Sequence, residues 1–376
     1  MVIHMKIIDY KTYAVHQMYR NLIFVKVFTD EGIYGVGEAT IEWKTNATVG
    51  AFEDIRPYII GADPTRIEYI FHECFRQTYW HTDPCTLSAI AAIEMACVDI
   101  TGKMYNMPAY QLFGGKLHDR IKIYVNGWSR AREPKGFGED AAAAVEKGAK
   151  ALKWDCFGKS WITITHEAMD RVVNSVAAVR EAVGPNIDLL IEAHGRFNVH
   201  TALQIAKELA PFKPKFIEEP VFTDIVQDTI EFHKYSPVPT AAGERLFGKT
   251  MFRELINNYG TDYVQPDLMH CGGMNEMKKI GVMAEVQGIQ IAPHNPNGPI
   301  AAAATAHVCA TLPNFEFLET IGGYEFRSEI TDENLIIEDG YLVISDKPGL
   351  GIDINEAVIE KFPSQPTPQI MFSGAF

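Results

Sequence analysis

Several features that would tie this 376-residue chain to particular partners are absent from it. Basic residues are in deficit, with 34 Lys and Arg against 48 Asp and Glu, which gives a net charge of −14. Nucleic acids and anionic membranes attract basic surfaces, so we expect neither as a partner. The six cysteines are scattered and form no Cys-x-x-Cys pair. This pattern favours free thiols in a reducing cytoplasm over a disulfide framework or a zinc site.

Segments that would place the chain in a membrane are also missing. We find no signal peptide and no apolar run of roughly 18 residues. The most apolar helix expected, residues 299–312, is rich in alanine and too short to span a bilayer. We therefore expect a cytoplasmic protein. With 47% hydrophobic and 22% charged residues, the composition is globular and sufficient for a barrel plus a second, smaller domain.

A buried strand that ends in polar residues gives the first indication of a site. Residues 187–191 are largely apolar, and Glu192 and His194 follow them. Because side chains alternate along a strand, Glu192 and His194 point to the same side. A carboxylate and an imidazole placed together could bind a metal or move a proton. Taken alone, these residues would equally suit a half-exposed strand end.

The same arrangement recurs five more times, at intervals of about 25 residues, which suits one strand, one helix and two short loops. The later apolar segments end at Glu218, Glu244, Asp267, His294 and Glu319. A (β/α)8 barrel gathers its strand ends around one mouth, where such barrels carry out chemistry. We therefore expect an α/β fold of this type in which the six positions meet.

The remaining elements complete the barrel and add a cap. Further barrel strands are expected at 122–125 and 151–155, and barrel helices at 167–183, 199–210, 225–235, 250–258, 275–286 and 300–312. An N-terminal α+β unit has strands at 22–28 and 33–38, a loop at 41–47 and helices at 48–59, 66–78 and 87–105. Short segments near 335–337, 341–344 and 348–352 have no place in a closed barrel, so we expect this tail to return to the N-terminal unit. The predicted domains are a capping domain at 1–120, a barrel at 121–320 and the returning segment at 321–376.

In their order these motifs resemble the enolase superfamily, mandelate racemase subgroup, over essentially the whole chain. The motifs that carry the resemblance to sugar-acid dehydratases are His-Gly-Arg at 194–196, Ile-Glu-Glu-Pro at 217–220, Ala-Gly-Glu-Arg at 242–245, Gln-Pro-Asp at 265–267 and Ala-Pro-His-Asn at 292–295. Lys-Trp-Asp at 153–155 leans toward the gluconate branch, with galactonate dehydratases also similar. The resemblance implies dehydration of an aldonic acid, gluconate or galactonate, to a 2-keto-3-deoxy acid. It also implies a homo-oligomer.

Two positions depart from the pattern of the relatives that this chain resembles. Glu192 stands where galactonate-type enzymes usually have Asp, and it remains a hard oxygen ligand that is one methylene longer. Asp155 stands where racemases of the subgroup carry the second lysine of a Lys-x-Lys pair. An aspartate cannot act as that amine base, so a two-base racemase is disfavoured.

A metal site is expected from three glutamates on successive strands. Glu192, Glu218 and Glu244 have no thiolate near them in the pattern. Hard oxygen ligands of this kind suit Mg2+, with Mn2+ as a possible substitute. Each glutamate alone would equally suit a salt bridge to a neighbouring Lys or Arg.

The expected chemistry begins with removal of the proton next to the substrate carboxylate. His294 is the expected base, and Asp267 would fix its tautomer. His194, across the mouth, is the expected acid for the departing β-hydroxyl, with a structural histidine as its alternative. Lys153 would neutralise negative charge. The resemblance assigns Glu319 a donor role toward a substrate carboxylate oxygen, although it would also suit an exposed strand-end acid.

Substrate specificity is expected from residues around the mouth. The candidates for substrate binding are Arg196, together with Trp43, Lys44, Tyr79, Trp80 and His81 in the loops of the cap. The aromatic residues among them would equally pack the cap on the barrel. Arg245 could pair with acids or with substrate, and Glu219 points away from Glu218 along its strand.

Three other functions are compatible with the same residues. An epimerase or cycloisomerase would act on an acid sugar through the same enediolate without net loss of water. A catalytically silent relative would only bind a metabolite. A hydrolase with acidic metal ligands is less well supported, because the spacing offers no bridging set for a second metal.

Overall fold

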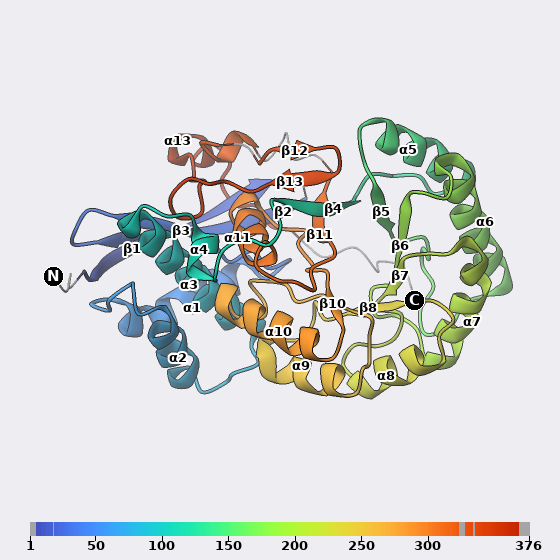
Figure 1. The fold of residues 1–376 in the computed structure, drawn as a ribbon, viewed down its shortest axis with the longest axis horizontal. Coiled ribbons are helices and arrows are strands. Elements are labelled where there is room, and N and C mark those ends of the chain that lie inside the picture. Colours follow the sequence, from blue (N-terminus) through green and yellow to red (C-terminus); the bar gives the residue numbers. More distant parts are fainter. Residues whose placement is uncertain (1–4, 18, 323–327, 334, 368–376) are drawn as a thin grey trace.

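Eight parallel strands follow one another around the barrel in sequence order (Figure 1). In the computed structural model, which describes residues 5–17, 19–322, 328–333 and 335–367, they are β4 (Arg120–Asn126), β5 (Ala151–Trp154), β6 (Asp188–Glu192), β7 (Phe216–Glu218), β8 (Thr240–Ala242), β9 (Tyr263–Val264), β10 (Gln290–Ile291) and β11 (Leu318–Ile321). Strands β4 to β10 pair as successive neighbours, and β11 pairs with β4. Backbone hydrogen bonds from Ile291 N to Asn314 O and from Glu316 N to Ile291 O join β10 to the chain before β11. The predicted (β/α)8-type architecture is confirmed.

Large and small side chains fill the interior of the barrel. One buried residue from each strand, or from the segment next to it, forms a separate apolar cluster: Tyr124, Ala151, Leu190, Phe216, Ala241, Tyr263, Ala292 and Phe317. Residues on the other face of the strands, such as Leu152 and Ile191, pack against the helices. Strands such as β6 and β7 are buried on both faces, so they are continuous apolar runs, and polar residues occur where they end.

The barrel helices form an outer ring around the strands (Figure 1). They are α5 (Pro134–Glu146), α6 (His166–Val183), α7 (Val199–Leu209), α8 (Val226–Tyr235), α9 (Gly248–Asn257), α10 (Met274–Val286) and α11 (Pro299–Cys309), with a short 3-10 turn, η1 (Ala210–Phe212), after α7. The sequence predicted α6 to α11 within three residues at each end. Helix α5 was not anticipated, because Gly136, Gly138 and the alanine run at 141–144 obscure its apolar spacing.

The N-terminal unit packs a sheet against helices. Strands β1 (Ile7–Gln17), β2 (Arg20–Thr29) and β3 (Tyr34–Glu38) are antiparallel, and they are followed by α1 (Thr45–Ile59), α2 (Ile67–Gln77), α3 (Pro84–Tyr105) and α4 (Ala109–Leu112). Glycines in β3 allow α3 to lie directly on the sheet. A Cβ added at Gly35 would lie 2.1 Å from the backbone oxygen of Ala96, and one added at Gly37 would lie 2.0 Å from that of Ala92. No larger residue could occupy these positions without moving the helix.

Helix α3 corrects the expectation that the chain has no long apolar segment. It spans 22 residues and is apolar enough to cross a membrane by length and composition, the one such helix in the described part of the chain. Its apolar stretch is 89% buried inside the molecule. Buried polar residues such as Ser88, Glu94 and Asp99 interrupt the run of apolar residues along this helix, so no continuous apolar segment is visible in the sequence. In this structure α3 is the core helix of the N-terminal unit.

The C-terminal tail contacts both parts of the molecule. The hairpin of β12 (Ile337–Glu338) and β13 (Tyr341–Val343) pairs antiparallel with the start of β4, so the expectation that the whole tail lies on the N-terminal unit was wrong for this hairpin. The first residues of β4 extend beyond the barrel, which leaves them free to pair with the hairpin. After the hairpin, helix α13 (Glu356–Ile359) and residues to 363 lie along β1, while η2 (Ser328–Ile330) precedes the hairpin.

Two buried glutamates of the N-terminal unit attach it to the barrel. Glu38, at the end of β3, accepts hydrogen bonds from the backbone N–H groups of Gly298 (2.7 Å) and Ala301 (2.9 Å) at the start of α11. Glu94, on α3, accepts from Met274 N (2.9 Å) and Asn275 N (3.0 Å) at the start of α10. Carboxylates stabilise helix N-termini by satisfying unpaired donors and by their charge. These contacts fix the N-terminal unit over the strand ends.

Candidate active site

A cavity of about 1400 Å3 lies at the C-terminal ends of the barrel strands. The barrel contributes Lys153, Glu192, His194, Glu244, His270 and His294 to its lining. The N-terminal unit contributes Arg20, Glu42, Trp43 and Lys44, among others. The cavity is therefore bounded by both units, with acids and imidazoles on the barrel side.

Three glutamates gather on one side of the cavity. Glu192 and Glu218 end β6 and β7, Glu244 follows β8, and one carboxylate oxygen of each lies within 4.8 Å of the others. Burial and the charge of Glu192 raise the pKa of Glu218 well above its usual value. Glu218 Oε2 is buried without a hydrogen-bond partner among the described residues. A cluster of buried carboxylates with an unsatisfied oxygen is costly unless a cation neutralises it, so these residues fit a hard divalent ion.

Lys153 lies among the same acids. Its ammonium is 2.8 Å from Glu218 Oε1, 3.2 Å from Glu192 Oε2 and 3.0 Å from Glu319 Oε1. The side chain is buried, and burial alone would lower its pKa, but the carboxylates outweigh burial and hold the pKa well above its usual value. Lys153 is therefore a permanent positive charge at the base of the site.

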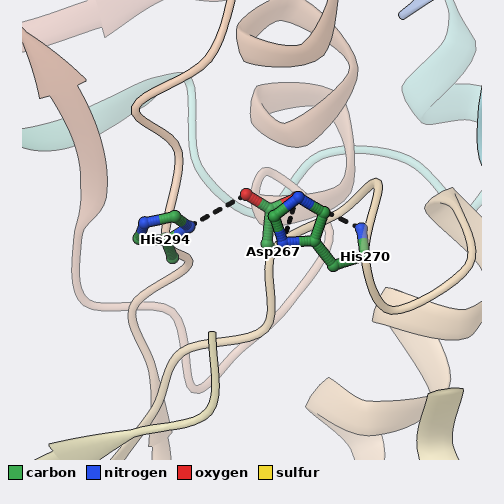
Figure 2. A group of neighbouring side chains, drawn as sticks. All are labelled: Asp267, His270 and His294. Atoms are coloured by element: carbon green, nitrogen blue, oxygen red, sulfur yellow. Dashed lines mark hydrogen bonds and ion pairs between the residues drawn. The ribbon is translucent and has the colours of Figure 1, made fainter. Parts of the chain in front are cut away.

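A carboxylate-held imidazole lies on the β9–β10 side of the mouth. Asp267 Oδ2 is 2.9 Å from His294 Nδ1 (Figure 2). Asn297 Nδ2 donates to the same oxygen at 2.7 Å, and the backbone N–H groups of Met269 and His270 donate to Oδ1. Burial lowers the pKa of His294, but the nearby Glu244 and Glu319 raise it above its ordinary value. Asp267 occupies Nδ1, and the other ring nitrogen, Nε2, lies 3.3 Å from Glu244 Oε2 at the edge of the glutamate cluster.

A second carboxylate-held imidazole lies on the opposite side, since β5 and β6 are the second and third strands and β9 and β10 the sixth and seventh. His194 Nδ1 is 2.8 Å from Asp155 Oδ2, and its backbone N–H donates to Glu192 Oε1 at 2.7 Å. Arg196 donates to the same oxygen of Asp155. Here too the carboxylate occupies Nδ1, which leaves Nε2 for the cavity.

Glu319 is surrounded by donors. Its Oε1 accepts from Asn126 Nδ2 (2.9 Å), and its Oε2 accepts from the backbone N–H of Asn295 (3.0 Å). Burial would raise the pKa of this carboxyl, but Lys153 and His294 outweigh it and lower the pKa. The residue is thus held as a carboxylate, and this setting does not favour the proton-donor role that the resemblance suggested.

Two residues that follow barrel strands at the site have left-handed backbones, which are unusual for residues other than glycine. His194 has φ of 51° and Glu219 has φ of 39°. Glu219 is buried and pairs with Arg245, whose Nε lies 3.1 Å from Glu219 Oε2. Such conformations cost about 1–3 kcal/mol each and persist where surrounding contacts enforce them. Here they turn the chain sharply after β6 and β7 and direct the side chains that follow.

The other predicted substrate-binding residues divide into two groups. Trp43 and Lys44 line the cavity. Tyr79 and Trp80 are 75% and 76% exposed, and His81 stacks on Phe75; none of the three is among the described lining residues. Arg196 corrects our expectation as well. Its side chain is buried, and its guanidinium donates to Ala193 O, Gly158 O and Asp155 instead of facing the cavity.

Sequence reasoning missed several polar residues of the site. In the sequence Asp155 marks only the replacement of a lysine, and no pattern singles out Asn126, Arg20 or His270. His270 lies beside Asp267 and lines the cavity, and its Nε2 is buried without a hydrogen-bond partner among the described residues (Figure 2). The position of Asp155 could have been found from the strand pattern. Residues two apart on a strand point to the same face, so Asp155 lies on the same face as Lys153.

Family models cover both units of the chain. Residues 8–114 match the model of the mandelate racemase/muconate lactonizing enzyme N-terminal domain, and residues 136–358 match that of the enolase C-terminal domain-like family. The chain belongs to the enolase superfamily. It is therefore an enzyme of a superfamily that acts on small molecules, as the resemblance implied.

Relatives of this enolase-superfamily chain include a D-gluconate dehydratase from Thermoproteus tenax, 33% identical over 92% of this chain and 70% of the relative. A mandelate racemase/muconate lactonizing enzyme from Jannaschia sp. CCS1 superposes with a TM-score of 0.90 at 31% identity, covering 96% of this chain and 98% of that one. A protein from Mesorhizobium loti, provisionally named a dehydratase, has a TM-score of 0.91 at 30% identity over 96% and 99% of the two chains.

Proposed function

We propose that this enzyme dehydrates an aldonic acid to a 2-keto-3-deoxy acid, with gluconate and galactonate as the first candidates. The observation that carries the proposal is the pair of carboxylate-held imidazoles, Asp267–His294 and Asp155–His194, on opposite sides of one carboxylate cluster. Dehydration needs a base on one side and an acid on the other. The D-gluconate dehydratase among the relatives supports the same chemistry.

The first step is removal of the C2 proton next to the substrate carboxylate. His294 Nε2 accepts this proton, and the C–H electron pair moves into the enediolate. Asp267 stabilises the imidazolium that forms, since its carboxylate lies 2.9 Å from Nδ1. Asn297 and the two backbone N–H groups hold Asp267 in that orientation.

The second step is loss of the C3 hydroxyl. Hydroxide is a poor leaving group, so it leaves as water when His194 Nε2 donates a proton to it as the C3–O bond breaks. The enediolate electrons form the C2–C3 double bond. The resulting enol tautomerises to the 2-keto-3-deoxy acid, so the overall reaction releases one water.

We assign Glu192, Glu218 and Glu244 as ligands of a divalent cation, with Mg2+ first and Mn2+ as a substitute. When bound, such an ion lowers the free energy of the negative charge that develops on the substrate carboxylate. Lys153, with its ammonium among the acids, adds fixed positive charge beside the same group. Glu319 orients Lys153 and Asn295 in this scheme, because it accepts hydrogen bonds from both.

The surroundings of the reaction are part of the proposal. Trp43 and Lys44, in the cap loop that lines the cavity, would contact the distal hydroxyls of the sugar acid. We also propose a homo-oligomer and a cytoplasmic location. The six cysteines, all free and buried, suit a reducing compartment.

The test is a screen of aldonic acids with Mg2+ that detects 2-keto-3-deoxy acid, with gluconate and galactonate first. Wild type is compared with His194→Asn and His294→Asn. Turnover of one acid, with both variants inactive, would support the proposal. Exchange of the C2 proton with D2O that requires only His294, without dehydration, would instead indicate an epimerase or cycloisomerase. Mg2+ binding without turnover or exchange would indicate a non-catalytic relative.

A further inference from the structure

The contacts of Asp155 give it a role that its place in the sequence did not suggest. It follows the last residue of β5, and in the register of β5 with β6 Trp154 lies opposite Ile191, which places Asp155 beside the segment that carries His194. Asp155 Oδ2 is 2.8 Å from His194 Nδ1. The pairing of β5 with β6 therefore places the Asp155 carboxylate next to the His194 imidazole.

The Asp155 carboxylate is fixed from three directions. Its Oδ1 accepts the backbone N–H of Phe157 at 2.9 Å, and its Oδ2 accepts from Arg196 and from His194. Arg196 is itself 1% exposed and is held by Ala193 O (2.8 Å) and Gly158 O (3.0 Å). A guanidinium fixed in this way cannot rotate away, so Asp155 presents its second oxygen to His194 at a set position.

The orientation of His194 follows from this contact. Arg196 Nη2 is 3.3 Å from Nδ1, but it is a donor, and the closer charged acceptor is Asp155. Nδ1 therefore carries a proton toward Asp155, and Nε2 is the nitrogen that faces the cavity lined by His194. The left-handed backbone of His194, with φ of 51°, is a costly conformation that the surrounding contacts must enforce.

We propose that Asp155, clamped by Arg196, is the positioning residue of the proton donor His194. It would keep the imidazole in the tautomer and orientation that deliver a proton from Nε2 to the leaving hydroxyl, as Asp267 does for the base. This inference rests on the proposed dehydration. It also assigns Arg196 the role of holding Asp155 in place, instead of a role in substrate binding.

The test is Asp155→Asn, which keeps the shape and removes the charge. We expect the rate of 2-keto-3-deoxy acid formation to fall on the order of 100-fold, with little change in KM. Removal of the C2 proton belongs to His294 and should continue. Recovered substrate should therefore take up deuterium at C2 in D2O, read by NMR. The matched change Asp267→Asn on the other side should abolish both dehydration and exchange.

A double-mutant cycle distinguishes positioning from general damage. If Asp155 acts through His194, adding Asp155→Asn to His194→Asn should leave the rate of C2 proton exchange in D2O unchanged, because that exchange does not require His194. Circular dichroism and thermal melting check that each variant folds. Arg196→Lys, which retains a charge but loses the fixed fork, should give a milder version of the same phenotype.

The outcomes separate the two proposals. If wild type forms no 2-keto-3-deoxy acid from any sugar acid, the proposed function fails and this inference fails with it. If wild type dehydrates and Asp155→Asn stays within two-fold of it, the function stands and the role of Asp155 is refuted. A loss of C2 proton exchange when Asp155→Asn is added to His194→Asn also refutes it, because the effect would then not pass through His194.

Discussion

Single residues at this site are held by contacts that no local sequence pattern encodes. Asp155 and His194 are 39 positions apart and meet only because their strands are neighbours. Glu319 reaches Asn126 across the pairing of β11 with β4. The strand-end acids and histidines could be predicted, because each interrupts an apolar run. Their partners could not, since partner choice depends on register and on side-chain direction.

Glu218 provides a test of the metal site at the residue scale. Glu218→Gln removes one negative charge from three oxygens that lie within 4.8 Å of one another. We expect Mg2+ affinity to fall on the order of 100-fold, with activity lost in parallel, because a neutral amide is a weaker ligand for a hard cation. Isothermal titration calorimetry measures the affinity directly.

Glu276→Gln is the matched control for this experiment. Glu276 is also a buried glutamate, but it pairs with Lys249 and Lys279 and is not one of the three clustered glutamates. Its replacement should leave Mg2+ affinity unchanged even if it lowers stability. Equal weakening by both variants would show that the effect reflects general disruption and that Glu218 is not a ligand.

His307 makes the stability of the fold depend on pH. It is buried on α11, where Nε2 lies 3.2 Å from Leu350 O and the ring stacks on Tyr110. Burial lowers its pKa from 6.5 to about 4. The unfolded chain then binds a proton more readily than the native state does. Its contribution to stability is therefore complete above pH 6.5 and is lost as pH falls toward 4.

The expected loss from this residue is about 3 kcal/mol across that pH range. Urea unfolding of wild type at pH 7 and pH 4.5 measures the fall. His307→Asn cannot ionise, so its free energy of unfolding should fall less over the same interval. The same change at the exposed His200 serves as the control. If the free energy of unfolding of His307→Asn falls between pH 7 and pH 4.5 as much as that of wild type, this histidine is not the cause.

At the scale of elements, helix N-termini connect the cap to the chemistry. Helix α11 begins directly after the loop that carries His294, Asn295 and Asn297, and the capping carboxylate of Glu38 comes from β3 in the other unit. The helices were predictable from their apolar spacing and from Pro299. The capping contact of Glu38 with α11 could not be predicted, because a capping residue 260 positions away leaves no local signature.

Glu38→Gln tests this coupling. The amide nitrogen that replaces one carboxylate oxygen cannot accept from Gly298 or Ala301, so a buried N–H loses its partner. We expect a loss of about 2 kcal/mol in the free energy of unfolding. We also expect lower activity in the folded enzyme, since the same loop positions His294. Urea unfolding and steady-state kinetics on the same samples measure the two effects.

Thr165→Ala is the matched control for that variant. Thr165 caps α6 through Ala168 N at 3.2 Å, and that helix carries none of the site residues. Loss of the Thr165 hydroxyl should lower the free energy of unfolding by about 1 kcal/mol. It should leave the turnover of the folded enzyme unchanged. If Glu38→Gln behaves like Thr165→Ala in the kinetic assay, the contact is purely structural.

At the scale of the whole molecule, the division into units is clearer in the sequence than in the packing. In the sequence, the start of the barrel is marked by a change in pattern. Strands and long helices without a repeat give way to a regular alternation of one short strand and one helix. Yet one continuous hydrophobic cluster contains residues of the cap sheet, such as Val25, together with barrel residues such as Met277 and Ile300. Long-range packing of this kind has no trace in composition or periodicity.

That shared core predicts that cap and barrel unfold together. The six thiols report on both units, since Cys74, Cys85 and Cys97 lie in the cap and Cys156, Cys271 and Cys309 in the barrel. Burial raises the pKa of every one of them, to about 12 for Cys74. Because the thiolate is the reactive form, native enzyme should not react with a thiol reagent at pH 8.

Labelling with a disulfide reagent across a urea series, followed by peptide mass spectrometry, measures each thiol separately. If the shared core makes unfolding cooperative, all six should become reactive with one midpoint, coincident with the loss of helical signal. Labelling of the three cap thiols at lower urea would show that the cap unfolds first. The buried carboxylates of Glu38 and Glu94 would then be too weak to couple the two units, and the orientation of the mouth would depend on the barrel alone.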